Sequence, residues 1–308
     1  MEKRDEVIKN RSEILFLYDV KDANPNGDPA DENKPRIDEE IGINIVTDVR
    51  LKRTIRDYLH DYKKQDIFIL EIKDENGKLK TKEDRLKDFE NKSDIVKQKC
   101  IDIRLFGATT AVEEQTMALT GPVQFKYGRS LHKVDSTYIK GTTVMPSAQE
   151  KRQGTFTERY ILPYSLIVFY GVVNENAVSS QELETTEEDI SLMLEGMWNG
   201  TKNLISGSKF GQMPRFLMQV IYKEGNFYIG ELDKRISCLS EKRDEEIRDI
   251  TEVKIDITNL IRTLNEHKDK IAKIRLKTDE RVIFVKDGEG IKKIQDALKE
   301  FNIEDLNF

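Results

Sequence analysis

The chain contains few of the residues that build metal centres or covalent cross-links, with two cysteines and three histidines among 308 residues. Cys100 and Cys238 have neither the close spacing of zinc ligands nor the number that a disulfide framework needs, which fits a reducing cytoplasm. His60, His132 and His267 are isolated from one another in the sequence. We therefore expect no metal site and no cofactor.

Long apolar runs are also absent. No segment approaches the ~20 apolar residues of a membrane-spanning helix, and none resembles a signal peptide. The sequence shows no repeat at solenoid periods and no low-complexity tract. These features predict a cytoplasmic protein with no membrane partner. A length of 308 residues is enough for one large domain or two ordinary ones.

The chain has no excess of positive charge: its net charge is −6. Taken alone, this argues against nucleic acid, for which a basic domain is expected. The charges are nevertheless segregated. Residues 50–64 hold six Lys or Arg against two Asp, and residues 196–215 hold three and no acid, whereas residues 174–195 hold seven acids and no base. Such a pattern suits a protein that grips a polyanion on one side and repels it, or meets a basic partner, on another.

Strand and helix patterns alternate irregularly along the chain. Ile14, Phe16, Tyr18 and Val20 share one face of a strand that runs into a loop rich in Pro, Asn and Gly at 21–29. Further patterns predict a helix at 43–64, with its apolar stripe at Val49, Ile55, Leu59 and Tyr62, and a second helix from Glu187. Strands are predicted at 67–72, 100–106, 121–125, 161–170, 215–222 and 227–232. The mixture favours an α+β fold, with an antiparallel sheet carrying helices on one face in a ferredoxin-like arrangement.

Two stretches do not fit such a core. Residues 78–99 are highly charged and predict a surface insertion. Residues 126–158 form a long polar segment with strand-like flanks, and a connection of this length inside a compact domain is usually a functional arm or a linker. We interpret it as an extended hairpin arm.

Five motifs occur in a characteristic order along the chain. They are Asn24-Pro-Asn-Gly-Asp-Pro29, Val46-Thr-Asp-Val-Arg-Leu-Lys-Arg53, Arg104-Leu-Phe-Gly107, Gly121-Pro-Val-Gln124 and Ser206-Gly-Ser-Lys-Phe-Gly-Gln-Met-Pro-Arg215. Together they resemble the Cas-seven family of backbone subunits of CRISPR Cascade, most closely its type I-B branch. The resemblance extends over residues from about 13 to 232.

The resemblance implies a fold and a function. The fold is a single domain over 1–308, a modified RNA-recognition-motif palm with finger regions at about 78–99 and a β-hairpin thumb at about 126–158. Family members bind the guide RNA (crRNA), join further copies of themselves head to tail and present the guide for pairing with target DNA in antiviral defence. They assemble with other Cascade subunits. A non-closing interface of this kind produces a helical filament.

The motifs and the cationic segments together predict the residues that contact RNA. The helix at 43–64 provides one backbone clamp and the acid-free, Gly-rich stretch before the strand at 215–222 provides a second. The thumb would insert Met145 as an apolar wedge between flanking cations. The predicted set is Asn24, Asn26, Lys52, Arg53, Arg56, Gln124, Lys140, Met145, Lys151, Arg152, Lys202, Ser206, Lys209 and Arg215.

Base stacking on the sheet is not expected, because the aromatic strand motif of RNA-recognition motifs is missing. Contacts to the RNA backbone would leave the bases free for Watson–Crick pairing.

Three alternative interpretations remain. Asp19, Asp22, Asp28 and Asp31 allow a metal-dependent RNA-cleaving enzyme like the related type III backbone subunit, although one loop seldom supplies the convergent carboxylates that a two-metal site needs. The run from Asp22 to Gly27 also matches half of a calcium loop, but Asn33 stands where the bidentate Glu is required. A structural protein without nucleic acid is the third. We predict that the chain is not an enzyme.

Overall fold

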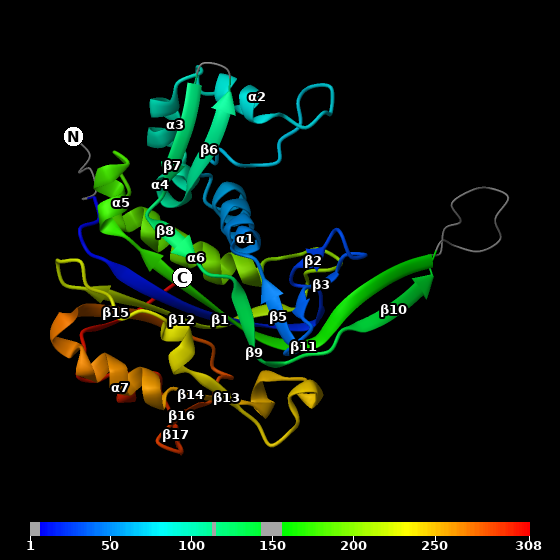
Figure 1. Ribbon diagram of the computed structural model, residues 1–308, viewed down its shortest axis with the longest axis vertical. Helices are drawn as coiled ribbons and strands as arrows, with labels where there is room; N and C mark the ends of the chain where they lie inside the picture. The colour runs from blue at the N-terminus through cyan, green and yellow to red at the C-terminus, as the bar shows by residue number, and fades with distance from the viewer. Residues whose placement is uncertain (1–6, 113–114, 143–155) are drawn as a thin grey trace.

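A large central sheet organises the computed structural model of the protein, which describes residues 7–112, 115–142 and 156–308 (Figure 1). The mixed α and β content agrees with the prediction. Strand β1 (Ser12–Ala23) lies at the centre and pairs in antiparallel fashion with β11 (Phe156–Val173) and β12 (Gln212–Tyr222). In spatial order the sheet runs β18 (Ile303–Asp305), β15 (Ile271–Thr278), β12, β1, β11, β9 (Gly128–Lys133), β5 (Ile43–Val46) and β4 (Ile37–Asp38), with β8 (Val123–Phe125) also paired to β11.

Helices α1 (Asp48–Asp61) and α6 (Glu187–Lys202) cover one face of this sheet (Figure 1). The alternating side chains of β1, including Phe16 and Tyr18, pack with Ile55 and Leu59 of α1 in one buried cluster. Thr186 caps α6 through a reciprocal capping box, as its sequence indicates. None of the described helices combines the length and apolarity required to span a membrane.

The C-terminal part of the chain covers the opposite face. Leu15 and Leu17 of β1 pack there with Tyr164, Tyr170 and Tyr222 and with side chains from residues beyond 230. The aromatic rings on this face are buried and therefore cannot stack on bases. The covering elements are α7 (Thr258–Glu266), α8 (Ile294–Ala297) and a small sheet of β13 (Ser237–Leu239), β14 (Lys254–Asp256), β16 (Phe284–Lys286) and β17 (Glu289–Ile291).

The segment from about residue 67 to 120 stands above the helices with a small core of its own (Figure 1). It comprises α2 (Lys82–Lys87), α3 (Ser93–Lys99), α4 (Ile101–Phe106) and a hairpin of β6 (Gly107–Val112) and β7 (Gln115–Thr120). Gly107 has φ +69° and ψ −175°, a conformation essentially restricted to glycine, and a Cβ there would lie 2.1 Å from the carbonyl oxygen of Leu119. This close approach explains why Gly107 and Gly121, at the two ends of the hairpin, belong to the sequence motifs.

A second hairpin extends away from the body of the molecule (Figure 1). Its strands are β10 (Thr137–Thr142) and the first part of β11, with Thr137 opposite Ile161. The predicted RNA contacts Met145, Lys151 and Arg152 lie outside the described residues. Within the stretch 126–158, residues 128–133 form β9 of the central sheet.

Three local predictions were wrong around the first helix. Residues 43–46 form strand β5, which lies between β9 and the edge strand β4. Asn44 is buried there, and its backbone N–H donates to the Ser130 hydroxyl over 2.9 Å. Val49 and Tyr62 are exposed, so the apolar stripe of α1 runs instead through Leu51, Ile55, Tyr58 and Leu59. Residues 67–72 form no strand.

Two further strand predictions were wrong. Residues 101–106 form helix α4, and Ile101, Ile103 and Leu105 are all buried because this short helix is enclosed on several sides. Their alternation therefore does not reflect a strand. Residues 227–232 form no strand, and β12 pairs instead with β1 and β15. The remaining elements are β2 (Gly27–Asp28), β3 (Lys34–Pro35) and α5 (Glu175–Ser180).

Candidate nucleic-acid interface

Three segments that are distant in sequence meet where β1 ends. They are the loop that follows β1, the N-terminus of α1 and the Gly-rich loop at 206–211 before β12. The backbone N–H of Asn24 donates to the Ser208 carbonyl oxygen over 2.9 Å, and that of Lys21 donates to Gly211 over 2.9 Å. The Gly-rich loop is therefore held against the end of the central strand.

The two predicted asparagines shape this region from inside. The Asn24 side chain is buried and its amide donates to the Asn33 carbonyl oxygen over 2.7 Å. Asn26 Oδ1 accepts hydrogen bonds from both the backbone N–H and the hydroxyl of Thr47, each 2.9 Å long. Thr47 is the N-cap of α1, so Asn26 fixes the loop to the helix start. Both side chains serve the loop's own architecture.

Arg50 and Lys209 bring two positive charges close together in this region. Burial and the nearby Arg50 charge lower the pKa of Lys209 to about 8. Burial likewise lowers the pKa of Arg50. Arg50 donates to the Thr54 hydroxyl over 3.0 Å and the Lys209 ammonium donates to the Asn24 carbonyl over 2.7 Å. Among the described residues, neither cation has a carboxylate within ion-pair distance. An anion placed here would neutralise two partly desolvated charges.

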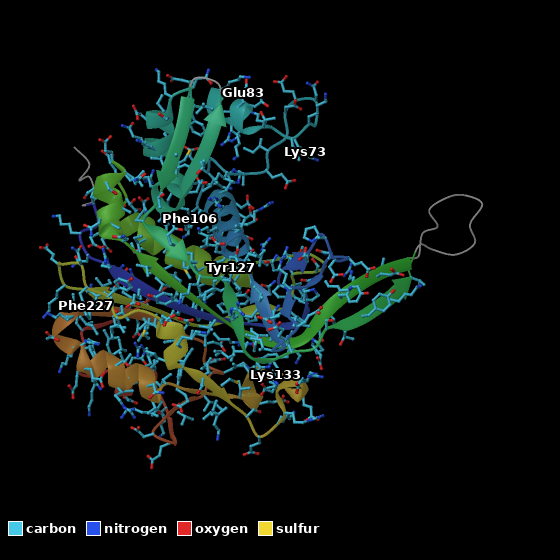
Figure 2. The ribbon with its side chains drawn as sticks, in the orientation of Figure 1. Lys73, Glu83, Phe106, Tyr127, Lys133 and Phe227 are labelled. Carbon is cyan, nitrogen blue, oxygen red and sulfur yellow. The ribbon has the colours of Figure 1, made fainter. Side chains whose placement is uncertain are left out.

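The predicted cations of α1 do not form one exposed patch. The Lys52 ammonium lies 3.0 Å from an Asp48 carboxylate oxygen, and the half-exposed Arg53 pairs with Asp57 at 3.1 Å. Arg56 is buried, and its Nε lies 2.9 Å from Asp102 Oδ2. Lys52 and Arg56 also lie over the ring of Phe106, which Figure 2 labels where the 67–120 segment meets the helices.

The residues of the second predicted clamp also do not form one exposed patch. Ser206 and Lys209 belong to the loop beside Asn24, whereas Lys202 is exposed at the end of α6. Burial lowers the pKa of Lys277, and the nearby charge of Lys202 lowers it further. Arg215 is buried and pairs with Asp19 at 2.9 Å and Asp279 at 2.7 Å. The Arg215 charge therefore fixes β12 to β1 and to the C-terminal part.

The remaining described candidates lie apart from this region. Gln124 pairs with Val172 near one end of β11, whereas Ala23 pairs with Leu162 toward the other. Ten residues of strand separate those positions by roughly 33 Å. Lys140 lies on β10 of the projecting hairpin, 3.4 Å from Glu158.

Arg50 and Arg159 were not singled out from the sequence; Arg50 lies in this region, and Arg159 contacts its Gly-rich loop from outside. The sequence does contain a signal for Arg50. A cation in the first turn of a helix is disfavoured by the helix dipole, so its presence there indicates a role other than stabilising the helix. Arg159, on β11, donates from Nη1 to the Gly207 carbonyl oxygen over 2.7 Å. No sequence pattern marks it.

Three of the four acids around the first loop pair with different cations. Asp28 pairs with Arg36 at 2.6 Å and Asp31 with Lys34 at 2.7 Å, while Asp19 faces Arg215 on the far side of the sheet. Over the described ranges, no group of three His, Cys, Asp or Glu side chains is placed to hold a metal ion.

These features define a class: a mixed α/β protein with an anion-attracting site at one end of its central sheet and two insertions that project from it. The family model for the CRISPR-associated protein Cas7 matches residues 10–258. A curated relative from Haloferax volcanii is named CRISPR-associated protein Cas7. It is 33% identical over an alignment 306 residues long, and the match covers 89% of this chain and 88% of the relative. The chain therefore belongs to the Cas7 family.

Solved structures share the fold at low sequence identity. One chain from a structure titled CRISPR RNA-guided surveillance complex, pre-nicking, aligns with a TM-score of 0.57 and 12% identity, covering 94% of this chain and 98% of that one. Another, from a structure titled CRISPR RNA-guided surveillance complex, aligns with a TM-score of 0.56 and 15% identity, covering 96% and 94%. At these identities the likeness concerns the fold.

Proposed function

We propose that this chain is the crRNA-binding backbone subunit of a type I-B Cascade surveillance complex in antiviral defence. Membership of the Cas7 family supports this assignment, as do the titles of the two aligned structures. The type I-B branch rests on the resemblance of the five motifs. The single observation that carries RNA binding is the pair Arg50 and Lys209, two partly desolvated cations at one site.

The palm of this subunit is an RNA-recognition-motif fold in this proposal. The chain order β1, α1, β9, β11, α6, β12 is that of a ferredoxin-like βαββαβ unit. The spatial order β12, β1, β11, β9 and the two helices on one face support the same description. The 67–120 segment provides the fingers and the β10–β11 hairpin the thumb of a single domain.

The guide RNA is held by its backbone. Arg50, Lys209 and the exposed Ser206 contact phosphates, and the half-exposed Arg53 lies on the same helix as Arg50. Arg56 and Arg215 are assigned structural roles, because both are buried against carboxylates. Since both faces of the central sheet are covered, the bases point away from it and stay free to pair with target DNA.

Copies of the chain assemble head to tail along the guide, in the cytoplasm and with other Cascade subunits. A heterologous interface that does not close extends into a helical filament. The projecting hairpin supports this arrangement, because a long arm that leaves the body of its own subunit is suited to reach a neighbour (Figure 1).

RNA affinity is expected to fall as the pH rises above 8. In the free protein the Lys209 pKa is about 8, and a bound phosphate raises it, so the complex takes up a proton. Between pH 7 and pH 9 the free lysine loses most of its charge and affinity should fall about tenfold. Titrations of RNA at fixed ionic strength measure this, and Lys209→Met should lose the dependence. Equal wild-type affinity at both pH values would contradict it.

We also propose that the subunit does not cleave RNA. The protein purified from cells that express a guide should carry RNA, and this RNA should stay intact after incubation with magnesium. The reason is that Asp28 and Asp31 pair with Arg36 and Lys34, and that no three acids converge on one point among the described residues. Cleavage that requires magnesium and disappears in Asp22→Ala or Asp28→Ala would establish the enzymatic alternative. Purification free of RNA would count against guide binding.

A further inference from the structure

The base of the β10–β11 hairpin contacts two loops of the same subunit. Arg159 Nη1 donates to the Gly207 carbonyl oxygen over 2.7 Å. The neighbouring Tyr160 hydroxyl donates to Glu32 Oε2 over 3.0 Å, and Lys34 lies 5.3 Å from the centre of the Tyr160 ring. Successive residues of one strand therefore reach the 206–211 loop and the loop that follows β1.

These two loops are the ones that build the candidate RNA site. They are joined to each other by the backbone hydrogen bond from Asn24 to Ser208 and by the contact of the Lys209 ammonium with the Asn24 carbonyl. The Arg159 hydrogen bond thus joins the hairpin to Gly207, and the backbone continues from there through Ser208 to Lys209. The position of the hairpin and the position of the phosphate-contacting lysine are mechanically connected.

Arg159 is suited to this connection by its chemistry. Its guanidinium bonds a carbonyl oxygen, and among the described residues it forms no ion pair with a carboxylate within 4 Å. Ser206 and Gly207 are exposed. The Ser206 carbonyl oxygen accepts from the backbone N–H groups of Lys209 and Phe210, each over 3.0 Å, so the loop is a closed turn and the Gly207 carbonyl oxygen faces the Arg159 guanidinium. Gly207 also allows the close approach, since a Cβ there would lie 3.2 Å from a guanidinium nitrogen.

We propose that Arg159 is a positioning residue that couples guide occupancy of a subunit's own site to the orientation of its projecting hairpin. This inference rests on the proposed function. A phosphate that orders the 206–211 loop also orders the Arg159 contact, and the hairpin is then fixed for the next copy. Coupling of this kind is reciprocal, so a hairpin held by a neighbour tightens RNA binding at its own site. Assembly along the guide is cooperative as a result.

The test compares two RNAs for the wild type and Arg159→Met. One RNA accommodates a single copy, as shown by its 1:1 stoichiometry, and the other accommodates several. The affinity per copy on the long RNA divided by that on the short RNA measures cooperativity. We expect this ratio to fall at least about tenfold in Arg159→Met, a loss of about 1.4 kcal/mol, with short-RNA affinity within about threefold of wild type. Arg159→Lys should recover part of the ratio.

A matched control removes one cation elsewhere. Lys126 pairs with Glu231, and Lys126→Met should leave the ratio unchanged. An unchanged ratio in Arg159→Met, or a wild-type ratio near one, would overturn the inference while leaving RNA binding intact. Equal losses on both RNAs would make Arg159 a direct phosphate contact and would also overturn it. Failure of the wild type to bind either RNA would instead remove the proposed function.

Discussion

Replacing Arg50 and Lys209 together with methionine is expected to weaken RNA binding at least about 100-fold, because each hydrogen bond to a charged group contributes roughly 1.5–3 kcal/mol. Methionine keeps an apolar stem of similar length, so the packing of α1 and the loop should persist. The log–log salt dependence should become shallower by about 1.4, since each phosphate contact on a single strand contributes about 0.7. Fluorescence anisotropy at several salt concentrations measures both quantities.

The matched control is Arg243→Met with Lys268→Met. These cations pair with Glu246 and Glu300 in the C-terminal part, so the control makes the same change in net charge away from the site. Its RNA affinity should stay within about threefold of wild type, because charges beyond a Debye length are largely screened. If the two double variants lose affinity equally, only overall charge is being measured and the assigned site is wrong.

Asp102→Ala is expected to lower the free energy of unfolding by about 3–5 kcal/mol, because it leaves the buried Arg56 charge without a partner. Asp102 is fully buried, and its carboxylate accepts from Arg56 Nε at 2.9 Å and from the backbone N–H groups of Phe68 and Ile69 at 2.8 and 3.1 Å. The substitution therefore removes the buried ion pair between α1 and the 67–120 segment. Denaturant unfolding followed by circular dichroism measures the change.

Asp61→Ala provides the comparison, because Asp61 lies on α1, the helix that carries Arg56, and its side chain is 64% exposed. It should change the free energy of unfolding by no more than about 0.5 kcal/mol. The result that would restore Arg56 to the RNA-contacting set is a stable Asp102→Ala protein in which RNA affinity alone has changed.

The sequence predicted those elements of the fold that have a clear period and clear end signals. The alternation in β1 and the helix start at Glu187 are local features, and both elements were found as predicted. Helix α4 was missed because a short helix buried on several sides lacks a polar face, so its periodicity cannot be distinguished from that of a strand. The pairing of β12 with β15 joins distant segments, and no local pattern encodes it.

The candidate site was predictable as a region and less so as individual residues. Charge runs identified the segments that meet beside Asn24, yet they did not tell which cations are already paired. The partner of Arg56 is Asp102, 46 residues away, and Arg215 pairs with Asp279, 64 residues away. Such long-range pairs show which of the predicted cations already have a carboxylate partner, and only the fold reveals them.

The most direct test of the central claim, that this chain holds a guide RNA by its backbone without reading its sequence, is the salt dependence of RNA binding. Two RNAs of equal length and unrelated sequence should bind the wild-type protein with affinities within about threefold of each other. Both affinities should fall steeply and in parallel as salt increases, because phosphate contacts release counterions. Undetectable binding, salt-independent binding, or a strong preference for one sequence would contradict the account.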